Sequence, residues 1–392
     1  RHHNSHPPGQ GIVKKILHIQ LLPLLSGVQN FSLHLLEGLP GDEFEIWVAS
    51  KPGGELVDAV LQRGYKYVPL RFLRHPVSPL DLAAFAEMLL LMKRQRFDIV
   101  HTNSSKTGLL GRVAATLCKV PFILHTAHGT AFQEGQSWLK KRFFMALEGL
   151  GNLFCHKVAF VNDSDREKCL RLGLLPPEKA ITINNALPPS QAEKLASIAD
   201  SRGFDPDRKD FVIGSTLRFS QQKNVVNLTA AACRACKKAP RLRFILLGDG
   251  EYLGLCRQIV RTHSMNERVL LPGWDADVSK WLGIFDAFIL YSRWEAQPFS
   301  IIEAMHAGLP VIGSRIPSIS ELVDPGSGWL VPLDDQSALI ETLVSISGKP
   351  EEAFARGNYA RERIREICDY PKMVDSYLEL YRHPEPGQEE EG

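Results

Sequence analysis

The chain has 392 residues, of which 44% are hydrophobic, and a formal net charge of +2. This length exceeds one ordinary hydrophobic core and predicts two domains, and the composition is that of a globular protein. The nearly neutral charge excludes bulk electrostatic attraction to nucleic acid, so any anionic partner must be bound by a local patch.

Cysteine usage and hydropathy bear on the compartment. Seven cysteines are spread mostly over helical stretches, and this odd number favours a reducing compartment over a disulfide framework. Cys233 and Cys236 share an alanine-rich helical run, for which packing on one helix face is the expected role. The sequence has no run of about 18 apolar residues and no signal-like start. We therefore expect a cytoplasmic protein, and localisation at the inner face of a membrane is the alternative.

Strands and helices alternate from residue 14 to residue 188, after residues 1–13, which we expect to be a disordered tail. The alternation implies a parallel sheet with helices on both faces, and so a Rossmann-like N-terminal domain. Seven short apolar runs are predicted to be its strands: residues 14–20, 44–49, 65–70, 97–101, 121–126, 157–161 and 180–184.

Two residues of this domain follow strand ends and are able to bind a ligand. Gly27 lies in the loop after the first strand, where backbone N–H groups at a helix start can hold a phosphate or a sugar. A turn required only by the backbone is the alternative. His128 follows the strand 121–126 and can donate a hydrogen bond to a sugar hydroxyl or titrate near neutral pH; a structural role is the alternative. His125, within the strand, is expected to be packed.

Residues 136–150, with the sequence QSWLKKRFFMALEGL, predict a basic and aromatic amphipathic helix. Two interpretations stay open. Such a helix can lie on an anionic membrane surface, or it can be an ordinary surface helix whose apolar side faces the core.

The second half of the chain repeats the architecture of the first without repeating its sequence. The polar residues 189–210 are expected to be the linker, and the strand–helix alternation restarts in a domain covering residues 211–368. Residues 369–382 form a predicted last helix, and residues 383–392 a disordered acidic tail. We expect an α/β fold of two facing Rossmann-like domains with a cleft between them.

Arg218 and Lys223 flank the loop after the strand 211–217. The planar fork of Arg and the compact charge of Lys suit a pyrophosphate, and two solvated surface charges are the alternative. Farther along, Gly248 opens a Gly-x-Gly turn and Trp274 ends a predicted strand, residues 269–274. A turn of this kind can also merely join a strand to a helix.

Two carboxylates, Glu295 and Glu303, lie between a buried strand, residues 286–291, and a helix that opens near Ser300. In an open parallel sheet this crevice binds ligands, and a helix start attracts phosphate. The alternatives are a solvated loop acid for Glu295 and, for Glu303, a capping box with Ser300.

The run that contains these acids carries a family resemblance. Glu295-x7-Glu303, followed by Ala-Met-x-Ala-Gly-x-Pro-Val-Ile, resembles the donor-site signature of retaining glycosyltransferases of family 4, which have the glycosyltransferase-B fold. Arg218-x4-Lys223 is similar to that family's Gly-Arg-x4-Lys-Gly, with other residues in place of both glycines. Ser26-Gly27-Val28-Gln29 is similar to its Gly-Gly-x-Glu/Gln loop, with Ser for the first Gly.

The resemblance implies a catalytic group of four residues. His128 and Glu295 would contact the donor sugar, and Arg218 and Lys223 would bind the diphosphate of the leaving group.

It also implies five residues that bind the rest of the donor. Glu303 would hold the ribose, Gly27 would approach the phosphates, and Gly248 would lie near the nucleotide. Trp274 would lie beside the base, and the helix start at Ser300 would add its dipole.

The predicted activity is retaining transfer of a hexose from a nucleotide diphosphate sugar to a glycan or lipid-linked acceptor, in polysaccharide or lipopolysaccharide biosynthesis. Family frequency favours a UDP-sugar, with no cofactor and no nucleic-acid partner. We expect no metal, because Asp-x-Asp at residues 163–165, 205–207 and 275–277 is interpreted as turn or cap acids. The rivals are a non-catalytic nucleotide-sugar-binding subunit and a sugar-nucleotide epimerase.

Overall fold

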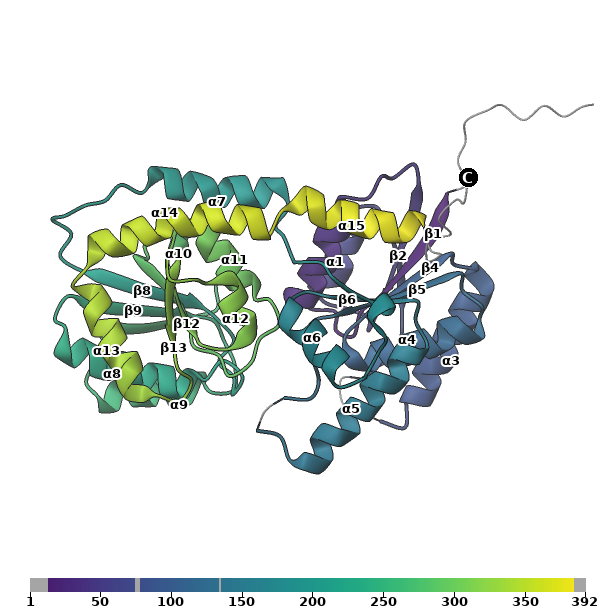
Figure 1. Ribbon diagram of the computed structural model, residues 1–392, viewed down its shortest axis with the longest axis horizontal. Coiled ribbons are helices and arrows are strands. Elements are labelled where there is room, and N and C mark those ends of the chain that lie inside the picture. The colour runs from purple at the N-terminus through teal and green to yellow at the C-terminus, as the bar shows by residue number, and fades with distance from the viewer. Residues whose placement is uncertain (1–12, 75–77, 134, 384–392) are drawn as a thin grey trace, which may run out of the picture. The chain divides into compact units, whose positions relative to one another are not determined.

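The computed structural model describes residues 13–74, 78–133 and 135–383 (Figure 1). The two expected tails lie outside this part of the chain except for Val13 and His383. The chain divides into two compact units. The first contains the described residues up to Val161, then Arg166–Ile183 and the residues from Pro371 onward; the second contains Asn162–Asp165 and Asn184–Tyr370.

The first unit is built on a parallel sheet with the strand order β3-β2-β1-β4-β5-β6-β7. Its strands are β1 (Lys14–Ile19), β2 (Phe44–Ser50), β3 (Lys66–Pro69), β4 (Ile99–Asn103), β5 (Phe122–Ala127), β6 (Lys157–Phe160) and β7 (Ala180–Thr182). Its helices are α1 (Gly27–Glu37), α2 (Glu55–Gln62), α3 (Asp81–Gln95), α4 (Ser105–Leu117), α5 (Trp138–Leu153), most of α6 (Asp163–Arg171) and nearly all of α15 (Tyr370–Arg382).

Alternate residues of β1 serve the two faces of this sheet. Leu17 and Ile19 belong to the apolar core that α3 and α4 cover. His18 is buried on the other face, where its Nε2 lies 3.2 Å from the hydroxyl of Tyr381 on α15. The same hydroxyl lies 2.6 Å from Nδ1 of His101, a buried residue of β4. Burial lowers the pKa of His18 to about 3, so this imidazole is neutral.

The second unit contains a parallel sheet with the order β10-β9-β8-β11-β12-β13. Its strands are β8 (Phe211–Thr216), β9 (Leu242–Leu247), β10 (Val269–Gly273), β11 (Ala287–Leu290), β12 (Val311–Ser314) and β13 (Gly328–Val331). Its helices are α7 (Pro189–Ser201), α8 (Val225–Lys238), α9 (Leu253–Thr262), α10 (Ser279–Leu282), α11 (Phe299–His306), α12 (Pro317–Leu322), α13 (Gln336–Ser347) and α14 (Pro350–Ile367).

The order of this second sheet reverses between β8 and β11. From β8 the chain proceeds to β9 and β10 toward one edge, and from β11 to β12 and β13 toward the other. Strand order therefore reverses at the carboxyl ends of β8 and β11, and open parallel sheets bind ligands at such a reversal point.

The part of the chain that we expected to be a linker, residues 189–210, begins with a helix instead. Pro189 is the first residue of α7, where its fixed φ suits a helix start. Helix α7 packs against α10 and α11 of the second unit. Only the first part of the expected linker is therefore helical, and the polar residues 202–210 follow α7 as a loop that leads into β8.

Several smaller expectations agree with the structure. Cys233 and Cys236 are buried on α8 and form no disulfide. Asp205 and Asp275 each accept a backbone N–H two residues later, as turn acids do. Across the described ranges, no helix is long and apolar enough to span a membrane.

The buried hydroxyl of Tyr381 is expected to stabilise the first unit. Tyr381→Phe removes the partner of two buried imidazoles, so the free energy of unfolding should fall by about 1–3 kcal/mol. Urea unfolding measures the change. The control is Tyr359→Phe, whose hydroxyl bonds Asp324 at an exposed position, and it should change stability far less. Equal effects of the two variants would contradict the anchoring role of Tyr381.

Candidate active site

The two loops at the reversal point of the second sheet are joined by three polar contacts. The backbone N–H of Arg293 donates to the carbonyl of Gln222 at 2.8 Å, and the Gln222 side chain donates to the carbonyl of Trp294 at 3.0 Å. Nζ of Lys223 lies 2.5 Å from Oε1 of Glu295. The loop after β8 and the loop after β11 therefore form one structure, with an ion pair at its centre.

Lys223 and Glu295 are largely enclosed, since their side chains are 16% and 6% exposed. The sequence left open the alternative that these residues are solvated surface charges, and this alternative is wrong for both. Removing two charges from water costs several kcal/mol per ion, and only close pairing offsets this cost. The pair therefore holds a cation and an acid in fixed positions at the sheet edge where open parallel sheets generally bind ligands.

Arg218 is arranged differently from Lys223. It lies two residues after the end of β8, its side chain is 75% exposed, and Nη2 lies 3.9 Å from Oε2 of Glu251. An exposed pair at this distance contributes little to stability. The structure thus brings together Lys223 and Glu295 but leaves Arg218 extended into solvent.

The Gly-x-Gly turn after β9 packs its backbone against the Arg218 loop. Gly248 has φ +136° and Gly250 has φ +152°, conformations that other residues rarely adopt. A Cβ on Gly248 would overlap the carbonyl of Leu217, and one on Gly250 would overlap the carbonyl of Phe219. The turn is required for close approach of two backbones, and through it Gly248 supports the segment that carries Arg218.

Glu303 does not take part in a capping box, so that alternative is wrong. Helix α11 begins at Phe299, its cap position is Pro298, and no side chain caps it, which leaves Ser300 in the first turn. The carboxylate of Glu303 accepts a hydrogen bond of 3.0 Å from Nε2 of Gln191 on α7. Desolvation raises the pKa of Glu303 to about 7, against the smaller opposing effect of Gln191.

In the first unit, Gly27 is the first residue of α1 and Ser26 occupies the cap position in an extended conformation. The Ser26 hydroxyl donates to the side chain of Gln29, and no side chain caps the helix. His128 follows β5, with Nε2 3.0 Å from Oδ1 of Asn103 and its ring edge-on to Phe31 at 4.7 Å. Burial lowers the pKa of His128 to about 3, so the ring is neutral and acts as a hydrogen-bonding group.

Comparison with known proteins places the chain in a family. Residues 26–186 match the family model described as glycosyl transferase 4-like domain, and residues 210–348 match glycosyl transferases group 1. An Escherichia coli protein, UDP-Gal:alpha-D-GlcNAc-diphosphoundecaprenol alpha-1,3-galactosyltransferase, is 32% identical over 94% of this chain and 96% of its own length. The chain belongs to the group 1 glycosyltransferases.

Two further comparisons extend this assignment. The alpha-monoglucosyldiacylglycerol synthase of Acholeplasma laidlawii is 25% identical to this glycosyltransferase over 90% of the chain and 95% of the relative. The Anabaena protein HepE, solved in complex with UDP and glucose, superimposes with a TM-score of 0.76 at 19% identity, over 94% of this chain and 99% of HepE. The predicted family and the glycosyltransferase-B fold of two Rossmann-like units are confirmed.

Sequence patterns missed two residues that hold the candidate groups of this glycosyltransferase. Gln191 bonds Glu303 from 112 positions away, and the polar stretch around it indicated a linker. Asn103 is fully buried at the end of β4 and bonds His128. It precedes Ser104, whose φ of +69° is unusual for a residue other than glycine. A polar residue at a strand end was the only signal available for Asn103.

The structure also describes the surroundings of Trp274, His125 and Glu321. Trp274 follows β10 with 67% of its surface exposed, so its indole ring is largely open to solvent. His125 is packed within β5, as expected. Glu321 accepts the backbone N–H groups of Asp163 and Ser164 at the start of α6, a structural role. The described residues contain no group of three or more metal-ligating side chains.

Glu303 is expected to make stability depend on pH. A carboxyl whose folded pKa is raised stabilises the fold while protonated, and this contribution is lost as the pH rises from about 4.5 to about 7. Glu303→Gln should therefore match the wild type near pH 4 and exceed it above pH 7, by roughly 2 kcal/mol, less than the full shift because the carboxyl is partly exposed.

Thermal unfolding across this pH range measures the difference. Glu341→Gln, at an exposed position of α13, is the control and should show no such dependence. A Glu303→Gln difference that is constant with pH would mean that the fold does not raise the pKa of Glu303.

Proposed function

We propose that this glycosyltransferase transfers a hexose, with retention of anomeric configuration, from a UDP-sugar to a lipid-linked acceptor. The pathway is the assembly of a cell-surface polysaccharide or lipopolysaccharide, and the reaction takes place on the cytoplasmic side of a membrane. The observation that carries the proposal is the enclosed Lys223–Glu295 pair at the reversal point of the second sheet. The names of two relatives support it: one uses UDP-Gal and a diphosphoundecaprenol-linked acceptor, and HepE was solved with UDP and glucose.

Charge compensation explains how these residues promote the reaction without a metal. The leaving group is a nucleoside diphosphate, which gains negative charge as the glycosidic bond breaks. Lys223 offers a fixed cation, and Arg218 offers a second cation on an extended side chain. The N-terminus of α11, which no side chain caps, adds the positive end of the helix dipole.

The two glutamates of the motif have separate parts in binding the donor. Glu295 faces the cation Lys223 and is proposed to accept hydrogen bonds from sugar hydroxyls. Glu303, held by Gln191, is proposed to bind the ribose hydroxyls. His128 is neutral and is proposed to hydrogen-bond the transferred sugar.

The proposed chemistry proceeds on one face of the sugar. Double displacement needs a protein carboxylate as nucleophile opposite the leaving group, and Glu295 is occupied by Lys223. We therefore infer front-side attack: the C1–O bond to the diphosphate breaks, and the acceptor oxygen bonds to C1 on the same face. The acceptor proton passes to the departing diphosphate oxygen.

A direct assay tests this function. The enzyme is incubated with UDP-galactose or UDP-glucose and a water-soluble, short-chain lipid diphosphate that carries N-acetylglucosamine. We expect acceptor-dependent release of UDP, an α-linked product by NMR, and unchanged rates in EDTA. Conversion of the donor without acceptor would indicate an epimerase, and donor binding without any turnover would indicate a binding subunit. A β-linked product would contradict retention.

Arg218 is predicted to act mainly on turnover. Its side chain makes one weak contact in the fold, so Arg218→Ala should leave stability unchanged. The loss of charge stabilisation on the leaving group should lower kcat on the order of a hundredfold. Arg261→Ala, on an exposed position of α9, is the matched control. Unchanged kcat in Arg218→Ala would remove this residue from the mechanism.

A further inference from the structure

Helix α5 exposes many of its large apolar side chains. Five large apolar residues on it are exposed: Trp138 (65%), Leu139 (71%), Phe143 (59%), Leu150 (46%) and Leu153 (71%). At about 100° per residue, they span roughly 140° of the helix circumference. They form one continuous stripe, which we call the outer stripe. Exposed apolar residues are ordinary when scattered singly, but a contiguous stripe indicates a partner.

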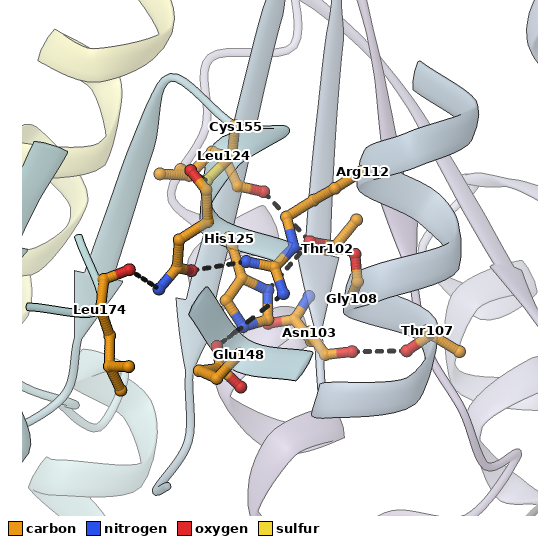
Figure 2. A network of polar contacts seen from close by, with 11 residues as sticks. Thr102, Asn103, Thr107, Gly108, Arg112, Leu124, His125, Glu148, Cys155 and Leu174 are labelled. Carbon is orange, nitrogen blue, oxygen red and sulfur yellow. Dashed lines mark hydrogen bonds and ion pairs between the residues drawn. The ribbon is translucent and has the colours of Figure 1, made fainter. Parts of the chain in front are cut away.

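The opposite side of α5 is fixed to the first unit. Phe144 and Met145 pack against the apolar core, and Asn152 is buried. Oε1 of Glu148 lies 3.8 Å from Nη2 of Arg112 and 3.9 Å from Nε2 of His125 (Figure 2). The only acidic side chain of the helix therefore points inward, and α5 cannot rotate its outer stripe into the core without breaking these contacts. The surface-helix interpretation therefore accounts for Phe144 and Met145, which pack on the core, but not for the exposed apolar residues of the outer stripe.

Cations accompany the outer stripe. Lys140, Lys141 and Arg142 lie in the first turns of α5, and Arg142 stacks on Trp138 at 5.2 Å. No acidic residue of α5 is on the outer side, because Glu148 is the helix's single acid. Aromatic and aliphatic groups beside unopposed cations are complementary to a surface that is apolar below and anionic above.

We propose that the outer stripe of α5 docks on the surface of an anionic lipid bilayer, with the apolar side chains in the acyl boundary and the three cations among the headgroups. The choice of occupant rests on the proposed lipid-linked acceptor. A second copy of the chain fits less well, because pairing through this stripe would bring two clusters of three cations into one interface.

Vesicle sedimentation tests the docking with the full chain and no donor or acceptor. The wild type is expected to bind phosphatidylglycerol–phosphatidylcholine vesicles more tightly than phosphatidylcholine alone. Lys140→Gln with Lys141→Gln should weaken binding to the anionic vesicles about 25-fold, at about fivefold per charge. Leu139→Gln with Leu150→Gln should weaken binding to both vesicle types by at least about tenfold.

Matched variants control for general effects. Lys237→Gln with Lys238→Gln removes two exposed cations of α8, and Leu61→Gln with Leu255→Gln removes two exposed leucines of α2 and α9. Both should bind vesicles like the wild type. Brominated lipids should quench the fluorescence of the wild type more than that of Trp138→Phe, which places this ring in the bilayer.

Three outcomes would overturn the proposal. The first is equal binding to anionic and neutral vesicles, and the second is unchanged vesicle binding by Leu139→Gln with Leu150→Gln. The third is a wild-type protein that binds no vesicles and sediments as a dimer, when the same double variant sediments as a monomer. Transfer to the water-soluble acceptor separates the two proposals. An enzyme that transfers but does not bind vesicles contradicts the docking alone. One that binds vesicles but does not transfer contradicts the proposed function alone.

Discussion

The ion pair between Lys223 and Glu295 sits where the second sheet is least continuous. Strands β8 and β11 share only a short register, Ala287 with Ile213 and Phe288 with Gly214, before their loops diverge. Beyond that point, side chains and loop backbone must hold the two halves of the sheet together. A largely buried pair does this strongly, because removal of one partner would leave an uncompensated charge in the interior. The same constraint keeps a cation ready at the ligand-binding edge.

The two glutamates of one motif are given different chemistry by their neighbours. Glu295 faces a cation, whereas Glu303 faces the neutral amide of Gln191 and has a pKa raised to about 7 by desolvation. Environments that separate two acids in this way usually assign them separate tasks. Here one carboxylate is paired with Lys223, and the other is a largely desolvated carboxyl that is bonded by a neutral amide.

The sequence predicted the strands well, and it also predicted the loop and helix that carry Glu295 and Glu303, because the signals for these elements are local. Apolar runs between turn residues mark buried strands, and the spacing from Glu295 to Glu303 spans one loop and the first turns of one helix. Contacts made across long stretches of chain have no such signal. Nothing local near Gln191 indicates its bond to Glu303, and the polar residues of α7 suggested a linker. The close approach of Gly248 to the carbonyl of Leu217 likewise joins distant parts of the chain and has no local signal.

Helix α5 illustrates why an amphipathic pattern leaves its own orientation undetermined. Periodicity identifies a stripe of apolar residues but does not say whether protein or lipid covers it. The deciding contacts come from other elements: Arg112 on α4 bonds the carbonyl of Gly108 and the side chain of Asn152, and a Cβ on Gly151 would overlap its guanidinium. Because the buried Arg112 lies against the side of α5 that carries Glu148 and Gly151, the opposite side, with Trp138 and Phe143, faces outward. A sequence-level rule follows: in such a helix, the side that carries the lone acid and the small residues is the one to place against the protein.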